Sequence, residues 1–342
     1  MKSYSARNGA TSIHQNENAE VHADPILFAF PAYTYISKPL SALPDVIKGR
    51  FQARRFPNGE LHLDLDSFRP EEDCVIIGTI APPEKNLFSI LLLAHTLKKE
   101  RARKVTAILP YLSESRQDRS EPGKSFATPL IGRLLKIAGV DEVLTVDVHS
   151  LESLTLFPVP LRSLSPATIF ADEIIRLGMD DATILAPDEG ALPRVKDVAA
   201  RIGPEAQIAS MRKKRSNGGI SHSDISGTIG KRVVIIDDIL DTGSTLISCC
   251  KVLCSHGVGE IVIMVTHGLF TGQEWKELWD LNVKFIYCTD TLPPESYPVS
   301  KNIRLLSIIA LLTEEIRKAE STRFLSAEEE EEEAYDYDLS PW

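Results

Sequence analysis

Residues 233–246 read VVIIDDILDTGSTL and join an apolar run, two adjacent aspartates and a turn rich in glycine and hydroxyl residues. The apolar run before Asp237 and Asp238 is typical of a buried strand. The turn leads into a segment that we expect to be helical from about Thr245. A strand, a turn and a helix in this order predict one unit of a parallel α/β sheet.

The same stretch predicts a phosphate site. Ligands of open parallel sheets bind beyond the carboxyl ends of the strands. A turn of this composition at a helix N-terminus offers backbone N–H groups, hydroxyls and the helix dipole to a phosphate. Neighbouring acids can accept hydrogen bonds from sugar hydroxyls or hold a divalent cation. We therefore expect a ribose 5-phosphate site built from Asp237, Asp238, Asp241, Thr242, Gly243, Ser244 and Thr245.

Short apolar runs recur along the chain and alternate with helix-like segments. This alternation predicts mostly parallel sheets flanked by helices, with enough strands for two similar α/β domains. The segment GELHLDL instead alternates apolar and polar residues, as a half-exposed antiparallel strand does. The expected parallel strands are residues 26–30, 74–80, 105–109, 143–148, 183–187, 232–237, 260–266 and 283–288.

Composition divides the chain into two domains and two tails. Residues 1–24 are polar and patternless and are expected to form a mobile arm. The tail at 321–342 contains six consecutive glutamates and is expected to be disordered. Between them we expect an N-terminal domain at 25–165, completed by residues 305–320, and a C-terminal domain at 166–304.

Overall composition excludes several classes of protein. The chain of 342 residues carries a formal net charge of −10, which argues against a general binder of nucleic acid or of membrane surfaces. No apolar run approaches the length of a membrane span. The five cysteines are odd in number and form no CxxC pair, as is typical of reduced thiols. We therefore expect a cytoplasmic protein without nucleic-acid or membrane partners.

The stretch at 233–245 resembles the phosphoribosyl-pyrophosphate motif shared by type I phosphoribosyltransferases and ribose-phosphate pyrophosphokinases. Other segments resemble the pyrophosphokinases alone, in the same order along the chain. A simple phosphoribosyltransferase has one such domain and would leave residues 25–165 unexplained. The segments are RRFPNGELHLDL (54–65), LPYLSESRQDR (109–119), VDVHS (146–150), APDEGALPRVKDVAARIG (186–203) and CTDTLPPES (288–296).

This resemblance implies two domains of the type I phosphoribosyltransferase-like plan and a particular reaction. A ribose-phosphate diphosphokinase transfers the diphosphate of Mg–ATP to the anomeric hydroxyl of ribose 5-phosphate, giving phosphoribosyl pyrophosphate and AMP. His149 and Asp188 match residues that contact Mg²⁺ in the family. The resemblance further assigns the ATP site to Phe56, Asn58, Glu60, Arg116, Gln117 and His149.

The basic cluster at 211–215 matches the family's catalytic Lys-x-Arg pattern. Lys213 and Arg215 fit the pattern, with Lys214 as the alternative one residue along. The Gly/Ser-rich segment that follows, residues 217–227, predicts a flexible loop that closes over phosphates.

Two other functions remain open from the sequence. A non-catalytic regulatory paralogue would share the motifs, as would, less well, a phosphoribosyltransferase. The segment SEPGKSFATP (120–129) lacks the family's usual basic stretch, so the resemblance leaves regulation by phosphate and ADP open. We expect a homo-oligomer, either a dimer, a tetramer or a hexamer.

Overall fold

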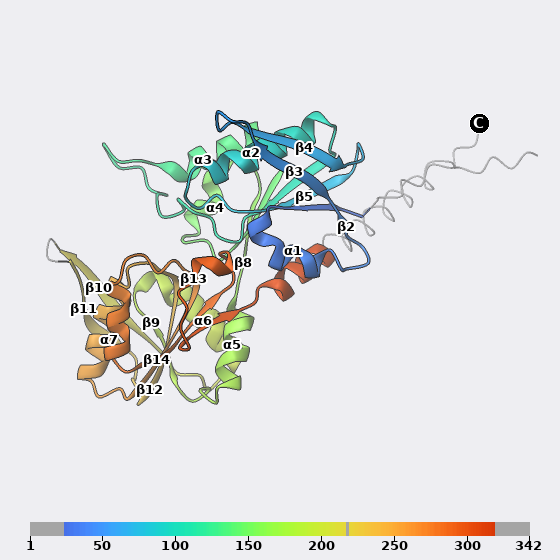
Figure 1. Cartoon of the computed structure of the whole chain (residues 1–342). Coiled ribbons are helices and arrows are strands. Elements are labelled where there is room, and N and C mark those ends of the chain that lie inside the picture. The colour runs from blue at the N-terminus through green and yellow to red at the C-terminus, as the bar shows by residue number, and fades with distance from the viewer. Residues whose placement is uncertain (1–23, 217–218, 319–342) are drawn as a thin grey trace, which may run out of the picture.

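The computed structural model describes residues 24–216 and 219–318. Figure 1 shows two α/β halves, the N-terminal half in blue to green and the C-terminal half in yellow-green to orange, while the red helix near the end of the chain lies beside α1. The fold class predicted from the sequence is confirmed, because each half is a mostly parallel sheet flanked by helices. Among the residues described, no helix is long and apolar enough to cross a membrane. The arm up to residue 23 and the acidic tail lie outside the described residues.

The first sheet has the strand order β2-β1-β5-β6-β7-β8, and every neighbouring pair is parallel. Its inner strands β1, β5, β6 and β7 contain short apolar runs, as expected of strands that are covered on both faces. They span Ile26–Ala29 (β1), Ile47–Lys48 (β2), Asp73–Ile77 (β5), Lys104–Ile108 (β6), Glu142–Val146 (β7) and Leu161–Leu164 (β8).

Helices cover both faces of this sheet. α2 and α3 pack on one face, where buried residues of both helices join the same apolar core. α1 packs on the other face together with the helix at residues 309–318. The helices span Thr34–Leu40 (α1), Lys85–Lys99 (α2), Ala127–Ile137 (α3) and Glu152–Leu156 (α4), and the short 3₁₀ turn η1 at Pro31–Tyr33 precedes α1.

The helix at 309–318 returns the end of the chain to the N-terminal half. Leu312 and Ile316 pack in one buried cluster with Leu27 and Ile77 of the first sheet. The helix follows β15, Ile303–Leu306, which is the last strand of the second sheet. The N-terminal half therefore contains two separate pieces of the chain.

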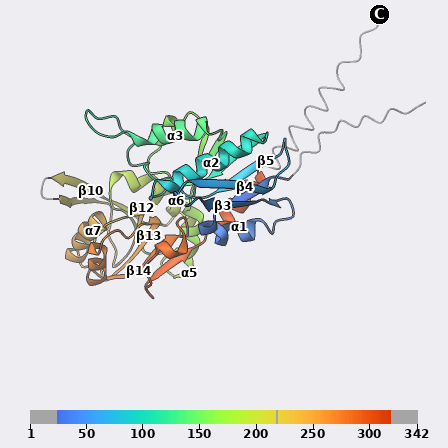
Figure 2. The ribbon, with the colours of Figure 1, turned by 45° about the horizontal axis from the view of Figure 1, so that its top comes forward.

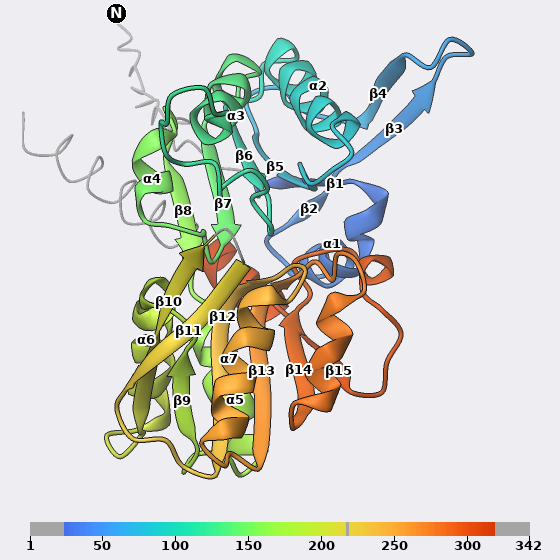
Figure 3. The same cartoon turned by 90° about the vertical axis from the view of Figure 1, so that its left-hand side faces the viewer.

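An antiparallel hairpin, β3 (Arg50–Arg55) and β4 (Leu61–Ser67), projects from the first half in Figure 3. Leu61, Leu63 and Leu65 pack on the core of this half. The alternating pattern at residues 59–65 correctly predicted an antiparallel strand, because alternate residues of a strand point to opposite faces.

The second sheet has the strand order β11-β10-β9-β12-β13-β14-β15, and only its edge pair β10–β11 is antiparallel among the described strands. α7 and the 3₁₀ turn η3 cover one face, and α5 and α6 cover the other. The strands span Thr183–Ala186 (β9), Ile208–Ser216 (β10), Gly219–Ser226 (β11), Arg232–Leu240 (β12), Glu260–Gly268 (β13) and Val283–Thr289 (β14). The helices and turns span Ala167–Arg176 (α5), Glu189–Ala191 (η2), Leu192–Ile202 (α6), Ser244–Ser255 (α7), Glu274–Asp280 (η3) and Pro294–Ser296 (η4).

β12 continues beyond Asp237, where the apolar run predicted its end. The neighbouring strand β13 is equally long, and Ile239 and Leu240 still pair with it. Asp237 and Asp238 therefore lie inside the strand, with exposures of 8% and 6%. The expectation that the strand ends at the acids was wrong, because the partner strand extends the pairing.

The loop predicted at residues 217–227 was also assigned wrongly where it is described. Residues 219–226 form β11, which pairs antiparallel with β10. In Figure 2 this hairpin projects from the same side as the segment that precedes α3. Residues 217 and 218 lie outside the described part. Composition favoured a loop, but backbone pairing with β10 decides the local structure.

Hydrogen bonds join the two halves near the segment that follows β14. The Tyr33 hydroxyl donates to the carbonyl of Thr291 at 3.0 Å. The Tyr35 hydroxyl lies 2.6 Å from the carbonyl of Asp290 and 3.0 Å from that of Leu292. The two tyrosines come from the start of the N-terminal half, so residues more than 250 positions apart meet here.

Candidate active site

A cavity of about 1270 Å³ lies between the two halves. Both halves line it, and most of the residues predicted for the site face it together. The N-terminal half contributes the segments after β6 and β7, and the C-terminal half contributes the segments after β9 and β12. The predicted residues in its lining are Arg116, His149, Asp188, Asp237, Asp238, Asp241, Thr242, Gly243, Ser244 and Thr245.

The turn at 241–245 forms the N-terminus of α7. Gly243 precedes the helix with φ +87°, a conformation that residues with a side chain rarely adopt. A Cβ atom there would lie 2.9 Å from the Cα of Trp275, so a larger residue has no room. The hydroxyls of Thr242 and Ser244 lie 2.9 Å apart. Glycine thus lets the backbone N–H groups of the first helical turn open toward the cavity, where an anion can bind.

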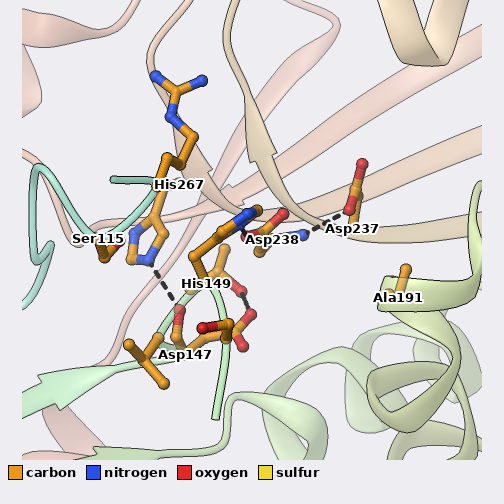
Figure 4. A network of polar contacts seen from close by, with 12 residues as sticks. Ser115, Asp147, His149, Ala191, Asp237, Asp238 and His267 are labelled. Carbon is orange, nitrogen blue, oxygen red and sulfur yellow. Dashed lines mark hydrogen bonds and ion pairs between the residues drawn. The ribbon is translucent and has the colours of Figure 1, made fainter. Parts of the chain in front are cut away.

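Asp238 carries the negative charge at the centre of the site. Its Oδ2 lies 2.5 Å from Nδ1 of His149 and 3.6 Å from a guanidinium nitrogen of Arg194. Burial opposes ionisation, but the hydrogen bond from His149 and the charge of Arg194 hold the pKa of Asp238 below its usual range. His149 comes from the other half, so this contact crosses the cavity (Figure 4).

Asp237 differs from its neighbour although the two acids are adjacent. Burial raises the pKa of Asp237, and the negative charges of Asp238 and Asp188 raise it further. Its Oδ1 accepts a hydrogen bond from the backbone N–H of Asp238 at 3.0 Å. The pair therefore has one ionised carboxylate and one carboxyl whose charge is unfavourable until a cation approaches.

Arg116 reaches across the cavity to the phosphate turn. Its two terminal nitrogens lie 2.9 and 3.0 Å from the same oxygen of Asp241. Gln117, the next residue, does not face the cavity; it hydrogen-bonds Glu114 and Ser125 instead. Of this Arg-Gln pair, only the arginine lies at the site in this conformation.

Asp188 and His149 were predicted to hold Mg²⁺. Asp188 caps the turn η2, where its Oδ1 accepts from the Ala191 N–H at 3.2 Å. The His149 ring contacts Asp238 through Nδ1, and its side chain is 40% exposed. Among the described residues, no three His, Cys, Asp or Glu side chains group closely enough to bind a metal by themselves. Mg²⁺ needs fewer, because it often takes one or two protein carboxylates, substrate phosphates and water.

Three of the residues predicted for the ATP site lie apart from the cavity. Phe56, Asn58 and Glu60 occupy the turn of the β3–β4 hairpin and are absent from the cavity lining. Phe56 is 46% exposed, and the Asn58 side chain accepts a hydrogen bond from the Glu60 N–H at 3.1 Å. Within this single chain they do not join the other site residues.

Lys213 and Arg215 lie on β10, the strand next to β9 in the second sheet. Their side chains are outside the described part of the structure. The neighbouring Arg212 does line the cavity, and its Nε lies 3.8 Å from an oxygen of Glu189. The backbone thus brings the basic cluster to the edge of the cavity.

The structure adds site residues that the sequence did not reveal. Arg194 contacts both Asp147 and Asp238. His267 lies 3.4 Å from the carbonyl oxygen of Asp147, and Figure 4 shows these two residues. Asp147 in turn contacts Arg194 and Thr266 of the other half. One available signal was position. Arg194 follows Asp188 by six residues, and His267 lies next to the last residue of β13.

The buried side chain of His267 should make the folding stability of the protein depend on pH. The ring is buried and packs against Tyr111 in a tilted arrangement, with the ring centroids 4.7 Å apart, and its Nδ1 lies 2.8 Å from the hydroxyl of Thr291. Burial lowers its pKa to about 4. In the unfolded chain, a histidine has a pKa of about 6.5. Between these two pKa values the unfolded chain therefore binds a proton that the folded protein does not.

Stability should therefore fall as the pH decreases from about 6.5 to 4, by about 3 kcal/mol from this residue. Urea unfolding of the wild type and of His267→Gln at several pH values measures this share. The difference between the two proteins should change across this window. Parallel pH curves would show that His267 does not contribute.

Comparison with known proteins places this geometry in a class. Residues 26–139 match the family model described as the N-terminal domain of ribose phosphate pyrophosphokinase, and residues 167–291 match the phosphoribosyl transferase domain. With an acid pair inside β12 and a Gly/Ser/Thr turn facing a shared cavity, the two domains define a diphosphate-transferring enzyme with a phosphoribosyltransferase-like plan.

Curated relatives show to which family of this class the chain belongs. The ribose-phosphate pyrophosphokinase of Hyphomonas neptunium is 32% identical over 292 residues, covering 82% of this chain and 93% of the relative. That of Campylobacter jejuni is 30% identical over 294 residues, covering 85% and 92%. The crystal structure of phosphoribosylpyrophosphate synthetase from Mycobacterium smegmatis superposes with a TM-score of 0.77 at 26% identity, covering 87% of this chain and 99% of that one. The chain belongs to the ribose-phosphate pyrophosphokinase family.

Proposed function

We propose that this protein makes phosphoribosyl pyrophosphate from ATP and ribose 5-phosphate. The anomeric oxygen of ribose 5-phosphate attacks the β-phosphorus of ATP and loses its proton. The bond from that phosphorus to the α-phosphate oxygen breaks, and AMP leaves. The observation that carries this proposal is the cavity in which Arg116 and His149 of one half face the acids and phosphate turn of the other.

The acceptor occupies the C-terminal side of the cavity. The turn at 241–245 binds the 5-phosphate through backbone N–H groups and hydroxyls. Asp237 and Asp238 accept hydrogen bonds from the ribose hydroxyls, which keeps the anomeric oxygen directed into the cavity. A sugar with hydroxyls and a terminal phosphate suits this combination of acids and anion-binding turn.

The donor occupies the N-terminal side. Arg116 offers a planar guanidinium to phosphate oxygens once it leaves Asp241. Phe56 offers an aromatic face, and Asn58 and Glu60 offer polar groups, to the adenine. Because their hairpin turn lies away from the cavity of its own chain, we propose a homo-oligomer in which this turn completes the site of a neighbouring subunit.

The residues present fit a magnesium ion. The raised pKa of Asp237 beside Asp238 and Asp188 marks a concentration of negative charge that a divalent cation would offset. We propose His149 and Asp188 as the protein ligands, beside bound phosphates. Bound there, Mg²⁺ would neutralise phosphate charge and orient the transferred group.

Lys213 and Arg215 supply the remaining positive charge. Their position on β10 beside Arg212 puts the basic cluster at the edge of the cavity. We propose that they stabilise the negative charge that develops as the bond to the α-phosphate oxygen breaks.

All five cysteines are free thiols. Free thiols suit the reducing cytoplasm, which we propose as the location of this protein.

The test is incubation with Mg–ATP and ribose 5-phosphate, followed by chromatography for AMP and phosphoribosyl pyrophosphate. We expect both products in equal amounts, and neither without ribose 5-phosphate. AMP formation that does not depend on ribose 5-phosphate, or none at all, would contradict the proposal. A non-catalytic paralogue would bind both ligands and form no AMP.

A further inference from the structure

Asp147 joins the two halves at the centre of the molecule. It follows β7 and has φ +48°, a conformation uncommon for residues other than glycine. Its carboxylate is buried, and its two oxygens contact different elements of the C-terminal half. Oδ1 accepts from Nε of Arg194 at 2.6 Å, and Oδ2 accepts from the Thr266 hydroxyl at 2.5 Å.

Arg194 holds the next two residues as well. It lies near the start of α6, and one terminal nitrogen lies 2.9 Å from the carbonyl oxygen of Val148 and 3.3 Å from that of His149. The same nitrogen lies 3.6 Å from Oδ2 of Asp238. One guanidinium therefore contacts three consecutive residues of the donor half and one acid of the acceptor half.

This arrangement fixes the backbone on which His149 stands. The ring contacts Asp238, 89 positions along the chain, across the boundary between the halves. A histidine side chain can hold that place only if its own backbone is fixed relative to β12. The contacts of Arg194 and Asp147 supply this restraint, since each links the segment after β7 to the second half.

We propose that Asp147 and Arg194 form a positioning pair that holds His149 against Asp238 and so aligns the donor half with the acceptor half. The inference rests on the proposed function, because alignment matters for a transfer between two bound substrates. The pair acts through His149 and the backbone rather than on the substrates. Misplacement of reacting groups by about 1 Å can cost about 100-fold in rate.

The residue types agree with this role. A guanidinium presents donors in a rigid planar fork and can bond the Asp147 carboxylate and the neighbouring carbonyls together. A lysine would keep the charge, but its single ammonium group cannot reproduce that geometry. Arg194→Lys therefore removes alignment while it retains the electrostatic attraction to Asp147 and Asp238.

The chain offers a matched control. Arg103 pairs with the buried Asp73 through the same atoms, Nε and Oδ1, at 2.9 Å. This pair joins β5 to the start of β6 inside the N-terminal half, and neither residue lines the cavity. Arg103→Lys makes the same chemical change in an ion pair that does not cross between the halves.

In the full-length enzyme, Arg194→Lys should lower kcat by about 10- to 100-fold while the KM for ribose 5-phosphate changes by less than about threefold. Arg103→Lys should keep the wild-type kcat. The ring signals of His149 in NMR spectra, assigned from their loss in His149→Ala, should move in Arg194→Lys and stay in place in Arg103→Lys. The NMR measurement needs no turnover.

Asp147→Asn, of nearly the same shape, provides a second variant should Arg194→Lys fold poorly, and it should show the same split between kcat and KM. Wild-type kcat with unmoved His149 signals in either folded variant would overturn the inference. A wild-type enzyme that forms no AMP would instead contradict the proposed function, and shifted His149 signals would still support the positioning pair.

Discussion

Lys213→Ala should lower the kcat for ribose-dependent AMP formation by about 100-fold or more while the Kd for ribose 5-phosphate stays within about threefold. The reason is that charge on the α-phosphate oxygen develops only in the transition state. An ammonium group that meets this charge contributes little to the ground-state complex. Lys213 lies on β10, whose Arg212 lines the cavity. Single-turnover kinetics with saturating substrates measures the first quantity, and calorimetry measures the second.

Lys214→Ala is the matched control, because the neighbouring lysine has the same chemistry one position along the same strand. It should retain turnover close to that of the wild type. The reverse pattern, with turnover lost in Lys214→Ala alone, would show that the wrong lysine has been assigned. Equal losses of turnover and ribose 5-phosphate affinity in Lys213→Ala would contradict a role confined to the transition state.

Asp238→Asn should raise the Kd of ribose 5-phosphate by about 30-fold, as expected when a charged hydrogen-bond acceptor is replaced by a neutral amide. The substitution also removes the carboxylate that faces His149 and Arg194. His149 and Arg194 then lose the carboxylate that both contact, so we also expect a lower free energy of unfolding. Isothermal titration calorimetry gives the Kd, and urea unfolding gives the stability.

Asp73→Asn separates the two effects. Asp73 is also a buried acid that pairs with an arginine, but it lies outside the cavity. Its replacement should lower stability and leave the Kd of ribose 5-phosphate unchanged. An Asp238→Asn protein that is folded and binds ribose 5-phosphate with wild-type affinity would remove Asp238 from the acceptor site.

The strands β1, β5, β6, β7, β9, β12, β13 and β14 could be predicted because each contains a short apolar run. The short or polar strands β2, β8, β10 and β11 contain no such run and were missed. Errors arose where a neighbouring strand decides the outcome. β12 extends through Asp237 and Asp238 because β13 continues beside it, and β11 forms because β10 offers an edge. The composition of a segment does not show which strand will pair with it. The composition of these two segments therefore predicted a strand end and a loop instead.

The site was predictable where its residues are close in sequence. The acids and the turn at 241–245 are one continuous stretch, and their joint position follows from one strand and one helix. Contacts such as those of Asp238 with His149 and of Asp241 with Arg116 depend on how two separate halves meet. The spacing of residues along the chain does not determine how the two halves pack together. Arg194 was missed for the same reason, because its contacts with Asp147 and Asp238 depend on that packing.

The return of residues 309–318 to the first sheet has a consequence for biosynthesis. During translation Leu27 and Ile77 leave the ribosome long before Leu312 and Ile316, which pack against them in the folded protein. Until the helix at 309–318 emerges, α1 covers only part of this face of the early sheet. Exposed apolar surfaces of this kind attract chaperones and other nascent chains. The C-terminal half, in contrast, can complete its own sheet during translation, so the part of the protein made first is the part finished last.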